Sequence, residues 1–117
     1  LGYLLGGADQ NRAEKGAADE DTDGVKTAKA KGRRNEWRTM RLLESVGYRC
    51  TRSAASLGDW DVIGIGRTDV VLVQVKTRDW PGTLERRALQ EFPVPPNVRK
   101  LLHRWRPRMR TPDVEEL

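Results

Sequence analysis

The run from Val70 to Lys76 constrains the fold of this chain more than any other stretch, because a series of strand-forming residues ends on two polar ones. Alternate side chains of a strand share a face, so Gln74 and Lys76 point to the same side as Leu72. Lysine is almost never fully buried without a partner. The run therefore predicts a strand that opens onto a polar site at its end.

The segment before this run completes a predicted hairpin. Residues 60–65 are also strand-like, and residues 66–69 have the composition of a turn between antiparallel strands. Counting back from this turn places Asp61 opposite Gln74, with Lys76 two residues further along the same face. A carboxylate, a carboxamide and an ammonium group are therefore expected to converge. A slip of one residue would turn Asp61 to the other face, so this expectation depends on the turn.

These three groups suit hydrolysis of a phosphodiester bond, which requires a divalent metal ion and a cation that balances charge on the phosphate oxygens. Asp61 offers Mg²⁺ or Mn²⁺ an anionic oxygen, Gln74 offers a neutral one, and the backbone carbonyl of Val75 completes the predicted shell. Lys76 then orients or deprotonates the attacking water, or stabilises the transition state. Each residue alone also has a structural explanation, and their shared face is what favours chemistry.

Basic charge is concentrated in the presumed folded part of the chain. Of 22 basic and 17 acidic side chains, residues 32–117 hold 17 and 11, and residues 86–110 contain eight Lys or Arg against the single acid Glu91. Such a cluster is typical of a surface that binds a polyanion, most often nucleic acid, although it also fits a solvated face that confers solubility. The predicted DNA-binding residues are Arg33, Arg34, Arg52, Arg78, Arg99, Lys100, Arg104 and Arg106.

A chain of 117 residues with 37% hydrophobic residues holds one modest domain. Residues 1–31 have the composition of a disordered segment, and residues 32–117 are the predicted domain. The first residue is Leu1 rather than Met, as in a processed product or a fragment. No apolar run reaches the roughly 18 residues of a membrane span. We therefore expect a soluble, cytoplasmic protein without a membrane partner.

Cysteine and histidine chemistry is largely excluded. The single cysteine, Cys50, cannot form an internal disulfide, and with His103 as the only histidine it cannot build a Cys/His zinc site. His103 lies in the basic stretch without a nearby Ser or Cys nucleophile. Both residues are expected to be structural.

Hydrophobic periodicity predicts a small α/β domain. An apolar residue recurs at every third position from Trp37 to Val46, which predicts a helix that Gly47 ends. A second stripe at helical spacing, from Val98 to Trp105, predicts a helix capped by Asn97. The predicted order is a helix, a three-stranded antiparallel or mixed sheet, and then helices. Its elements are a helix at 35–46, strands at 48–53, 60–65 and 70–76, helices at 84–92 and 97–105, and a short final strand within 109–117.

The chain resembles the PD-(D/E)xK nuclease superfamily, and within it the archaeal-type Holliday junction resolvases and their phage relatives. This resemblance implies a restriction-endonuclease-like core and a Mg²⁺- or Mn²⁺-dependent endonuclease in which Glu36, Asp61 and Gln74 bind metal. It further implies that Lys76 is catalytic and that Ser56 supports the active site. The resemblance covers Gly32 to about Arg78, and it rests on Glu36, Gly47-Tyr48, the segment 52–56, Asp61 with Val62-Ile63, and Gln74-Val75-Lys76.

Two positions depart from the family pattern. Trp60 replaces the proline of the name motif, and Gln74 replaces an acid, although a similar glutamine-x-lysine variant occurs in the Mrr-like branch of restriction enzymes. Because a carboxamide lacks the charge that attracts Mg²⁺, the predicted site relies more heavily on Asp61 and Glu36. Glu36 also has a structural explanation, since the helix macrodipole favours an acid in a first turn.

The resemblance leads us to expect a homodimeric Holliday junction resolvase-like enzyme, of prokaryotic or phage type, that acts on branched DNA. Two alternatives stay open. One is a Mrr-like or repair nuclease that cuts duplex or flapped DNA. The other is a non-catalytic DNA-binding module of the same fold, in which the carboxamide at Gln74 has removed the affinity for metal.

Overall fold

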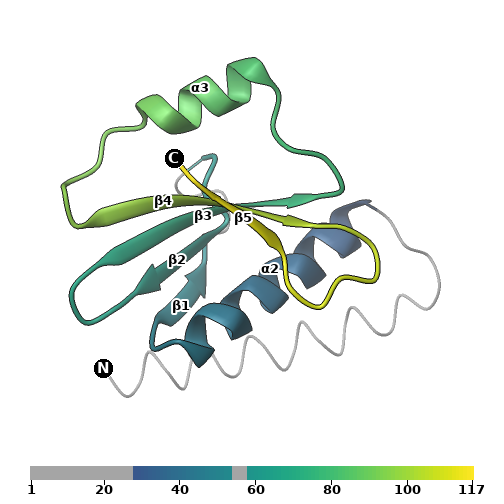
Figure 1. Ribbon diagram of the computed structural model, residues 1–117, viewed down its shortest axis with the longest axis horizontal. Coiled ribbons are helices and arrows are strands. Elements are labelled where there is room, and N and C mark those ends of the chain that lie inside the picture. The colour runs from purple at the N-terminus through teal and green to yellow at the C-terminus, as the bar shows by residue number, and fades with distance from the viewer. Residues whose placement is uncertain (1–27, 54–57) are drawn as a thin grey trace.

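One mixed five-stranded sheet carries a helix on each face (Figure 1). The structure is a computed structural model that describes residues 28–53 and 58–117. The strands lie in the order β1-β2-β3-β4-β5, and every neighbouring pair is antiparallel except β3 and β4, which are parallel. The predicted α/β class is confirmed, but the sheet has five strands instead of the predicted three. The elements are α2 (Ala28–Ser45), β1 (Arg49–Arg52), β2 (Val62–Ile65), β3 (Val70–Thr77), α3 (Thr83–Glu91), β4 (Val98–Trp105) and β5 (Asp113–Glu116).

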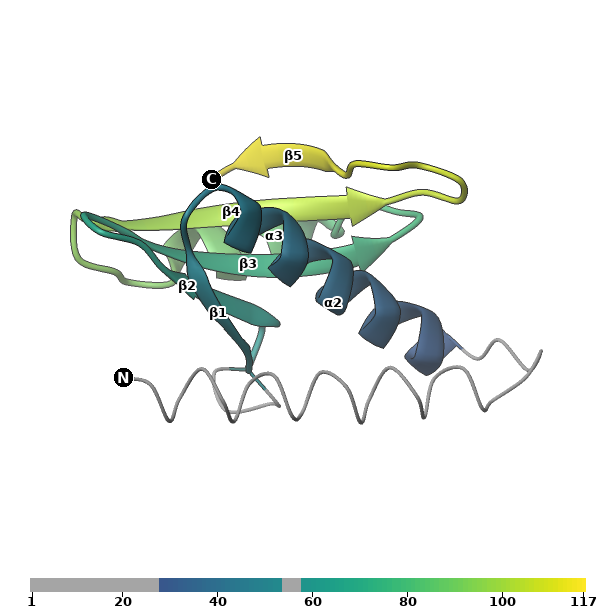
Figure 2. The same cartoon turned by 90° about the horizontal axis from the view of Figure 1, so that it is seen from below.

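Helix α3 connects the two parallel strands. Parallel neighbours require a crossover connection, so the chain leaves β3, passes through α3 over one face of the sheet, and returns as β4 beside β3. Figure 2 shows α2 and α3 on opposite sides of the sheet. β3 is therefore a central strand with a helix against each face, and its polar end lies within reach of both helices.

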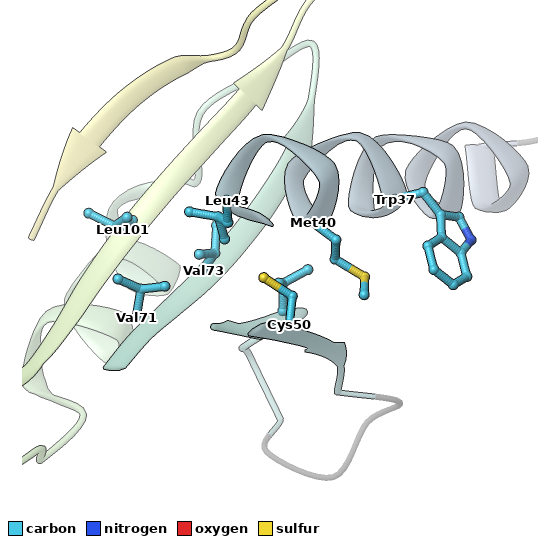
Figure 3. Packing of buried hydrophobic residues seen from close by; sticks show 8 residues of the cluster. Trp37, Met40, Leu43, Cys50, Val71, Val73 and Leu101 are labelled. Atoms are coloured by element: carbon cyan, nitrogen blue, oxygen red, sulfur yellow. The ribbon is translucent and has the colours of Figure 1, made fainter. Parts of the chain in front are cut away.

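Helix α2 and the sheet enclose one hydrophobic core (Figure 3). Trp37, Met40 and Leu43 of α2 pack in the same buried cluster as Val71 and Val73 of β3. The three helix residues belong to the predicted apolar stripe, and the two valines are alternate residues of one strand face. One face of β3 is thus fixed against α2.

A second core lies between the sheet and α3. Trp60, Leu72, Leu89 and Leu102 form this buried cluster, and the ring of Phe92 meets the Trp60 ring edge-on with 5.6 Å between centroids. Because Leu72 belongs to this core, the residues of β3 that alternate with it face α3. Gln74 and Lys76 are among them.

The predicted helix at 97–105 is wrong, because these residues form strand β4. β4 pairs in parallel with β3 from Val98 opposite Val70 to Trp105 opposite Thr77. Leu101 enters the core under α2, whereas Leu102 enters the core under α3. A strand buried on both faces has consecutive apolar residues rather than alternating ones, so its pattern imitates a helical stripe.

The other elements follow the predictions more closely. β2 and β3 have the predicted register, with Ile65 opposite Val70 and Ile63 opposite Leu72. The final strand is present as β5 within 109–117. Composition predicted disorder for residues 1–31, but residues 28–31 belong to α2, and residues 1–27 lie outside the described ranges. Within those ranges, no helix is long and apolar enough to cross a membrane.

A buried polar network joins α2 to β4. The indole N–H of Trp105 donates to Oγ1 of Thr39 at 2.8 Å, and that oxygen lies 3.2 Å from Nδ1 of His103. Only 2% of His103 is exposed, and its burial lowers its pKa to about 4. The imidazole is therefore neutral at neutral pH and belongs to the structural interior.

Candidate active site

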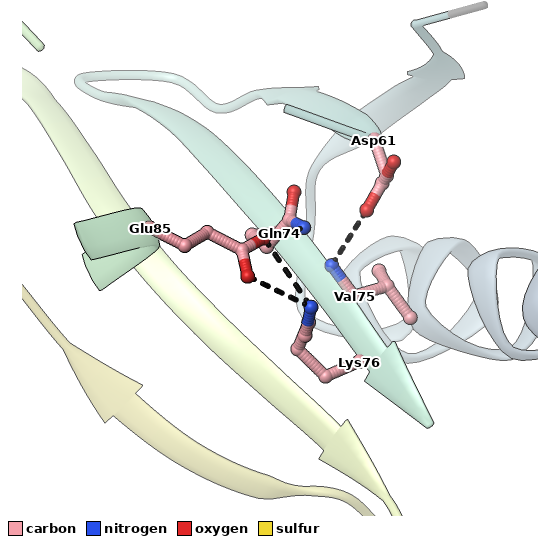
Figure 4. A network of polar contacts seen from close by, with 5 residues as sticks. All are labelled: Asp61, Gln74, Val75, Lys76 and Glu85. Carbon is pink, nitrogen blue, oxygen red and sulfur yellow. Dashed lines mark hydrogen bonds and ion pairs between the residues drawn. The ribbon is translucent and has the colours of Figure 1, made fainter. Parts of the chain in front are cut away.

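The site begins where β2 and β3 separate. The backbone N–H of Asp61 donates to the carbonyl of Val73 at 2.9 Å, and the backbone N–H of Val75 donates to Oδ2 of Asp61, also at 2.9 Å (Figure 4). The Asp61 carboxylate therefore completes the end of the ladder between the two strands. The register predicted that the Asp61 side chain lies beside Gln74. In the structure it contacts the backbone of β3 instead.

Trp60 explains this departure from the register. Strict alternation back from Ile63 would place Asp61 on the α3 side of the sheet, but the fully buried Trp60 occupies that side instead. β2 begins only at Val62, so the strand geometry used for the prediction does not extend to residues 60 and 61. Burial of the large indole decides the conformation of this segment.

Glu85 of α3 occupies the place that the register had given to Asp61. The Lys76 ammonium lies 3.1 Å from Oε1 and 3.2 Å from Oε2 of Glu85, and Nε2 of Gln74 donates to Oε2 at 3.2 Å (Figure 4). Gln74 is 9% exposed, and its Oε1 has no hydrogen-bond partner among the described residues. The site thus contains a buried carbonyl oxygen without a hydrogen-bond partner in the described part of the protein.

Sequence reasoning missed Glu85 because its contact with β3 is not local. The only available signal was an acid in the first turn of a predicted helix, where the helix dipole favours negative charge in any case. Whether that turn reaches the end of β3 depends on the path of residues 78–82, which periodicity does not predict. A crossover connection brings the first turn of α3 back over the strand it has just left.

The Asp61 carboxyl has a perturbed pKa. Its pKa is raised to about 6, chiefly by burial and also by the nearby charge of Glu36, although the Val75 N–H, Lys76 and Arg52 oppose the shift. Nε of Arg52 donates to Oε1 of Glu36 at 2.8 Å, so this acid is paired across α2 and β1. Two carboxylates therefore lie near one another in a partly desolvated place, as is typical of functional sites.

The Asp61→Asn variant is expected to melt at a higher temperature than the parent at pH 7.5. Asp61 has a higher pKa in the folded state, about 6, than its ordinary value of 3.8, so its favourable contribution is complete below about pH 4 and is lost as the pH rises through 6. Asparagine keeps an acceptor for the Val75 N–H without the desolvated charge. Thermal unfolding followed by circular dichroism between pH 4 and pH 8 measures the difference.

The difference between variant and parent should disappear as the pH falls toward 4. His103 titrates in the same window with the opposite sign, because its lowered pKa makes the folded state lose stability as the pH falls. Both proteins contain His103, so its effect cancels in the difference. A difference that stays constant from pH 4 to pH 8 would contradict the assignment to Asp61.

The end of β3 has oxygen donors of the kind that a hard divalent cation takes. Such ions take oxygen ligands, and an orphaned carbonyl oxygen at Gln74, the Asp61 carboxylate and the Val75 carbonyl are all of this type. Over residues 28–53 and 58–117, no three His, Cys, Asp or Glu side chains form a cluster able to hold a metal ion. A cation here would therefore depend on amide and backbone oxygens as well as on carboxylates. Ser56 lies outside the described residues.

Much of the predicted DNA-binding charge is engaged within the protein. β5 brings acids beside the basic strand β4, and these acids lie just beyond the stretch 86–110 in which arginines outnumbered them. Arg52 is likewise paired with Glu36, and Lys100 donates to backbone carbonyls at the end of α3. The pairs on β4 and its extension are Arg99 with Glu116 at 2.9 Å, Arg104 with Asp113 at 2.7 Å and Arg106 with Asp113 at 3.1 Å.

Exposed arginines remain at the end of the sheet where Lys76 lies. Arg78 follows β3 directly, and its backbone N–H donates to the carbonyl of Trp105 at the end of β4. Arg78 and Arg108 are exposed and adopt left-handed backbone conformations, with φ of 82° and 66°, which residues other than glycine rarely adopt. Of the two predicted arginines on α2, Arg34 is exposed, whereas Arg33 is half-buried and partnered.

No protein-family model matches this chain, and the comparison with curated proteins found no match either. The resemblance to PD-(D/E)xK nucleases therefore rests on the residues quoted above and stays a prediction.

Proposed function

We propose that this protein is a metal-dependent endonuclease that hydrolyses phosphodiester bonds in DNA, with branched DNA of the Holliday junction type as its substrate. One observation carries the proposal. Within a few residues of the end of β3, the structure has an ammonium group at Lys76, a buried unpartnered carbonyl oxygen at Gln74, and a desolvated carboxylate at Asp61. The α/β topology, with a helix before three antiparallel strands, is compatible with a restriction-endonuclease-like core.

Asp61, Gln74 and the backbone carbonyl of Val75 would hold Mg²⁺ or Mn²⁺. When bound, such an ion polarises the phosphate and lowers the pKa of its bound water. Glu36, paired with Arg52, would act through its charge beside Asp61. Because the pKa of Asp61 without a cation is raised to about 6, protons compete with a cation for this carboxylate increasingly as the pH falls below that value.

Lys76 would act on the reacting phosphate. Its side chain is 26% exposed, and its ammonium contacts Glu85, whose side chain is 35% exposed. A cation at this position balances the charge that develops on the phosphate oxygens. Exposed arginines at the same end of the sheet, Arg78 and Arg108, would contact the DNA backbone, which gives affinity that falls with salt concentration and carries little base specificity.

The direct experiment compares cleavage of a four-way junction and of a linear duplex with the same arms, in Mg²⁺, in Mn²⁺ and in a chelator. We expect metal-dependent nicking of the junction in preference to the duplex, and no comparable cleavage by Asp61→Asn. Equal rates on the two substrates would favour a Mrr-like or repair nuclease that cuts duplex or flapped DNA. A residual rate of Asp61→Asn near that of the parent would contradict the assigned site.

A non-catalytic DNA-binding module of the same fold is the second candidate. The contact that favours it is the ion pair between Lys76 and Glu85, which engages the ammonium group inside the protein. Binding of the junction without nicking in either metal would support this candidate.

Light scattering of the parent with and without junction tests the homodimer that two symmetric nicks would require.

A further inference from the structure

Glu85 contacts both polar side chains at the end of β3. Its two carboxylate oxygens lie 3.1 and 3.2 Å from the Lys76 ammonium, and one of them accepts from the Gln74 amide at 3.2 Å. No other acid among the described residues makes a hydrogen bond to either side chain. Glu85 is therefore placed to control the orientation of the Gln74 and Lys76 side chains toward a ligand.

The contact with Glu85 fixes the direction of the Gln74 amide. A carboxylate only accepts hydrogen bonds, so the end of the amide that faces Glu85 is its NH₂ group. The carbonyl oxygen then faces away from Glu85, and it is the atom that stays buried and unpartnered within the described part of the chain. Without the carboxylate at Glu85, the amide would be free to reverse and to present its NH₂ group instead.

Charge gives a second reason for Glu85 to matter. Gln74 and the Val75 carbonyl are neutral, and a site for a divalent cation gains affinity from negative charge close to its oxygens. Glu85 lies in the first turn of α3, where the positive end of the helix dipole stabilises a carboxylate. Its side chain is 35% exposed, so solvent ions reach it.

We propose that Glu85 is a positioning residue of the site, which holds the Gln74 carbonyl oxygen toward a divalent cation and supplies the negative charge that the carboxamide lacks. This inference rests on the proposed function, because it assumes that the site takes a divalent cation. A purely structural ion pair is the competing explanation. The two differ in what they predict for cation binding in a folded variant.

Binding of Mn²⁺ to the full chain, measured without DNA by the loss of the free Mn²⁺ signal in electron paramagnetic resonance, tests the inference. In Glu85→Gln we expect the affinity for Mn²⁺ to fall about 10- to 100-fold, the range seen when residues that orient metal ligands are changed. The melting temperature should stay close to that of the parent, because the new amide can still pair with Gln74 and Lys76. The matched control is Glu91→Gln, an exposed acid at the other end of α3, which should bind Mn²⁺ as the parent does.

A charge exchange gives a second readout. The double variant Gln74→Glu with Glu85→Gln keeps one carboxylate at the site and moves it from the helix to the strand, so Mn²⁺ affinity should recover relative to Glu85→Gln alone. If Glu85→Gln does not fold, Glu85→Asp replaces it. Aspartate keeps the charge on a shorter side chain, farther from Gln74 and Lys76, so the affinity of this variant for Mn²⁺ should lie below that of the parent. Parent-like Mn²⁺ binding by the folded Glu85→Gln variant, or by Glu85→Asp in its place, would overturn the inference. Failure of the double variant to recover would do the same.

The outcome for DNA cleavage separates this inference from the proposed function. If the parent binds Mn²⁺ but cuts no DNA, and Glu85→Gln binds Mn²⁺ more weakly, the nuclease is excluded and the role of Glu85 stands. If the parent cuts DNA and Glu85→Gln cuts it equally well, the nuclease stands and the role of Glu85 is excluded. A parent that binds no Mn²⁺ overturns both.

Discussion

Replacement of Lys76 by methionine is expected to lower the rate of junction cleavage about 10²- to 10⁴-fold, the usual contribution of a side chain that assists proton transfer or charge balance in a transition state. Methionine keeps much of the apolar stem but removes the ammonium group. The fold should be little affected, because the pair with Glu85 is partly exposed and such pairs contribute about 0 to 1 kcal/mol. Single-turnover cleavage at saturating protein measures the rate of the chemical step.

Lys100→Met is the matched control for this variant. Lys100 lies on the neighbouring strand β4, and its ammonium donates to the carbonyls of Leu89 and Phe92 at 3.0 Å, where it satisfies the end of α3. Its replacement should therefore reduce stability more than Lys76→Met does while leaving the cleavage rate of the folded protein unchanged. Parent-like cleavage by Lys76→Met would remove Lys76 from the proposed mechanism.

The hairpin was predictable because its information is local. Four turn residues and the alternation of β3 fix which residues face each other, and the observed register from Ile65 opposite Val70 agrees. The site next to the hairpin was only partly predictable. Gln74 and Lys76 share the predicted face, but the acid that meets them comes from α3, and nothing in the pattern of β3 specifies the path of a crossover connection.

Two further differences between prediction and structure have one physical cause. A short stretch of sequence does not show which other segments pack beside it. The strand β4 has a helix against each face of the sheet, so Leu101 and Leu102 are both buried and the alternation that identifies a strand is lost. The same stretch contains many arginines and a single acid, because the acidic partners Asp113 and Glu116 follow on the next strand. Antiparallel pairing brings these acids back beside β4.

The role of Trp60 also exceeded what the sequence indicated. In the sequence Trp60 stands out only as a replacement for the proline of the family pattern, but the structure gives it a fully buried position under α3, next to Phe92. Its burial turns the chain at residue 60, and the adjacent Asp61 carboxylate then meets the backbone of Val75. A core residue thereby sets the position of a site residue.

Trp60→Ala is accordingly expected to destabilise the fold by about 3 to 5 kcal/mol, the range for removal of a buried Trp or Phe side chain. Because domains are stable by only about 5 to 15 kcal/mol, this change removes a substantial part of the free energy of unfolding. Urea unfolding followed by circular dichroism measures the loss.

Trp60→Phe separates packing from the other properties of the indole. Phenylalanine keeps an aromatic ring against Phe92 and removes an indole N–H that has no hydrogen-bond partner in the described structure. Its loss of stability should therefore be smaller than that of Trp60→Ala, because phenylalanine removes only part of the buried side chain. Since the chain still turns at residue 60, Asp61 should keep its raised pKa, visible as a carboxyl titration near pH 6 by NMR. Equal stability of Trp60→Ala and Trp60→Phe would show that the indole does not anchor this segment, and the position of Asp61 would then need another cause.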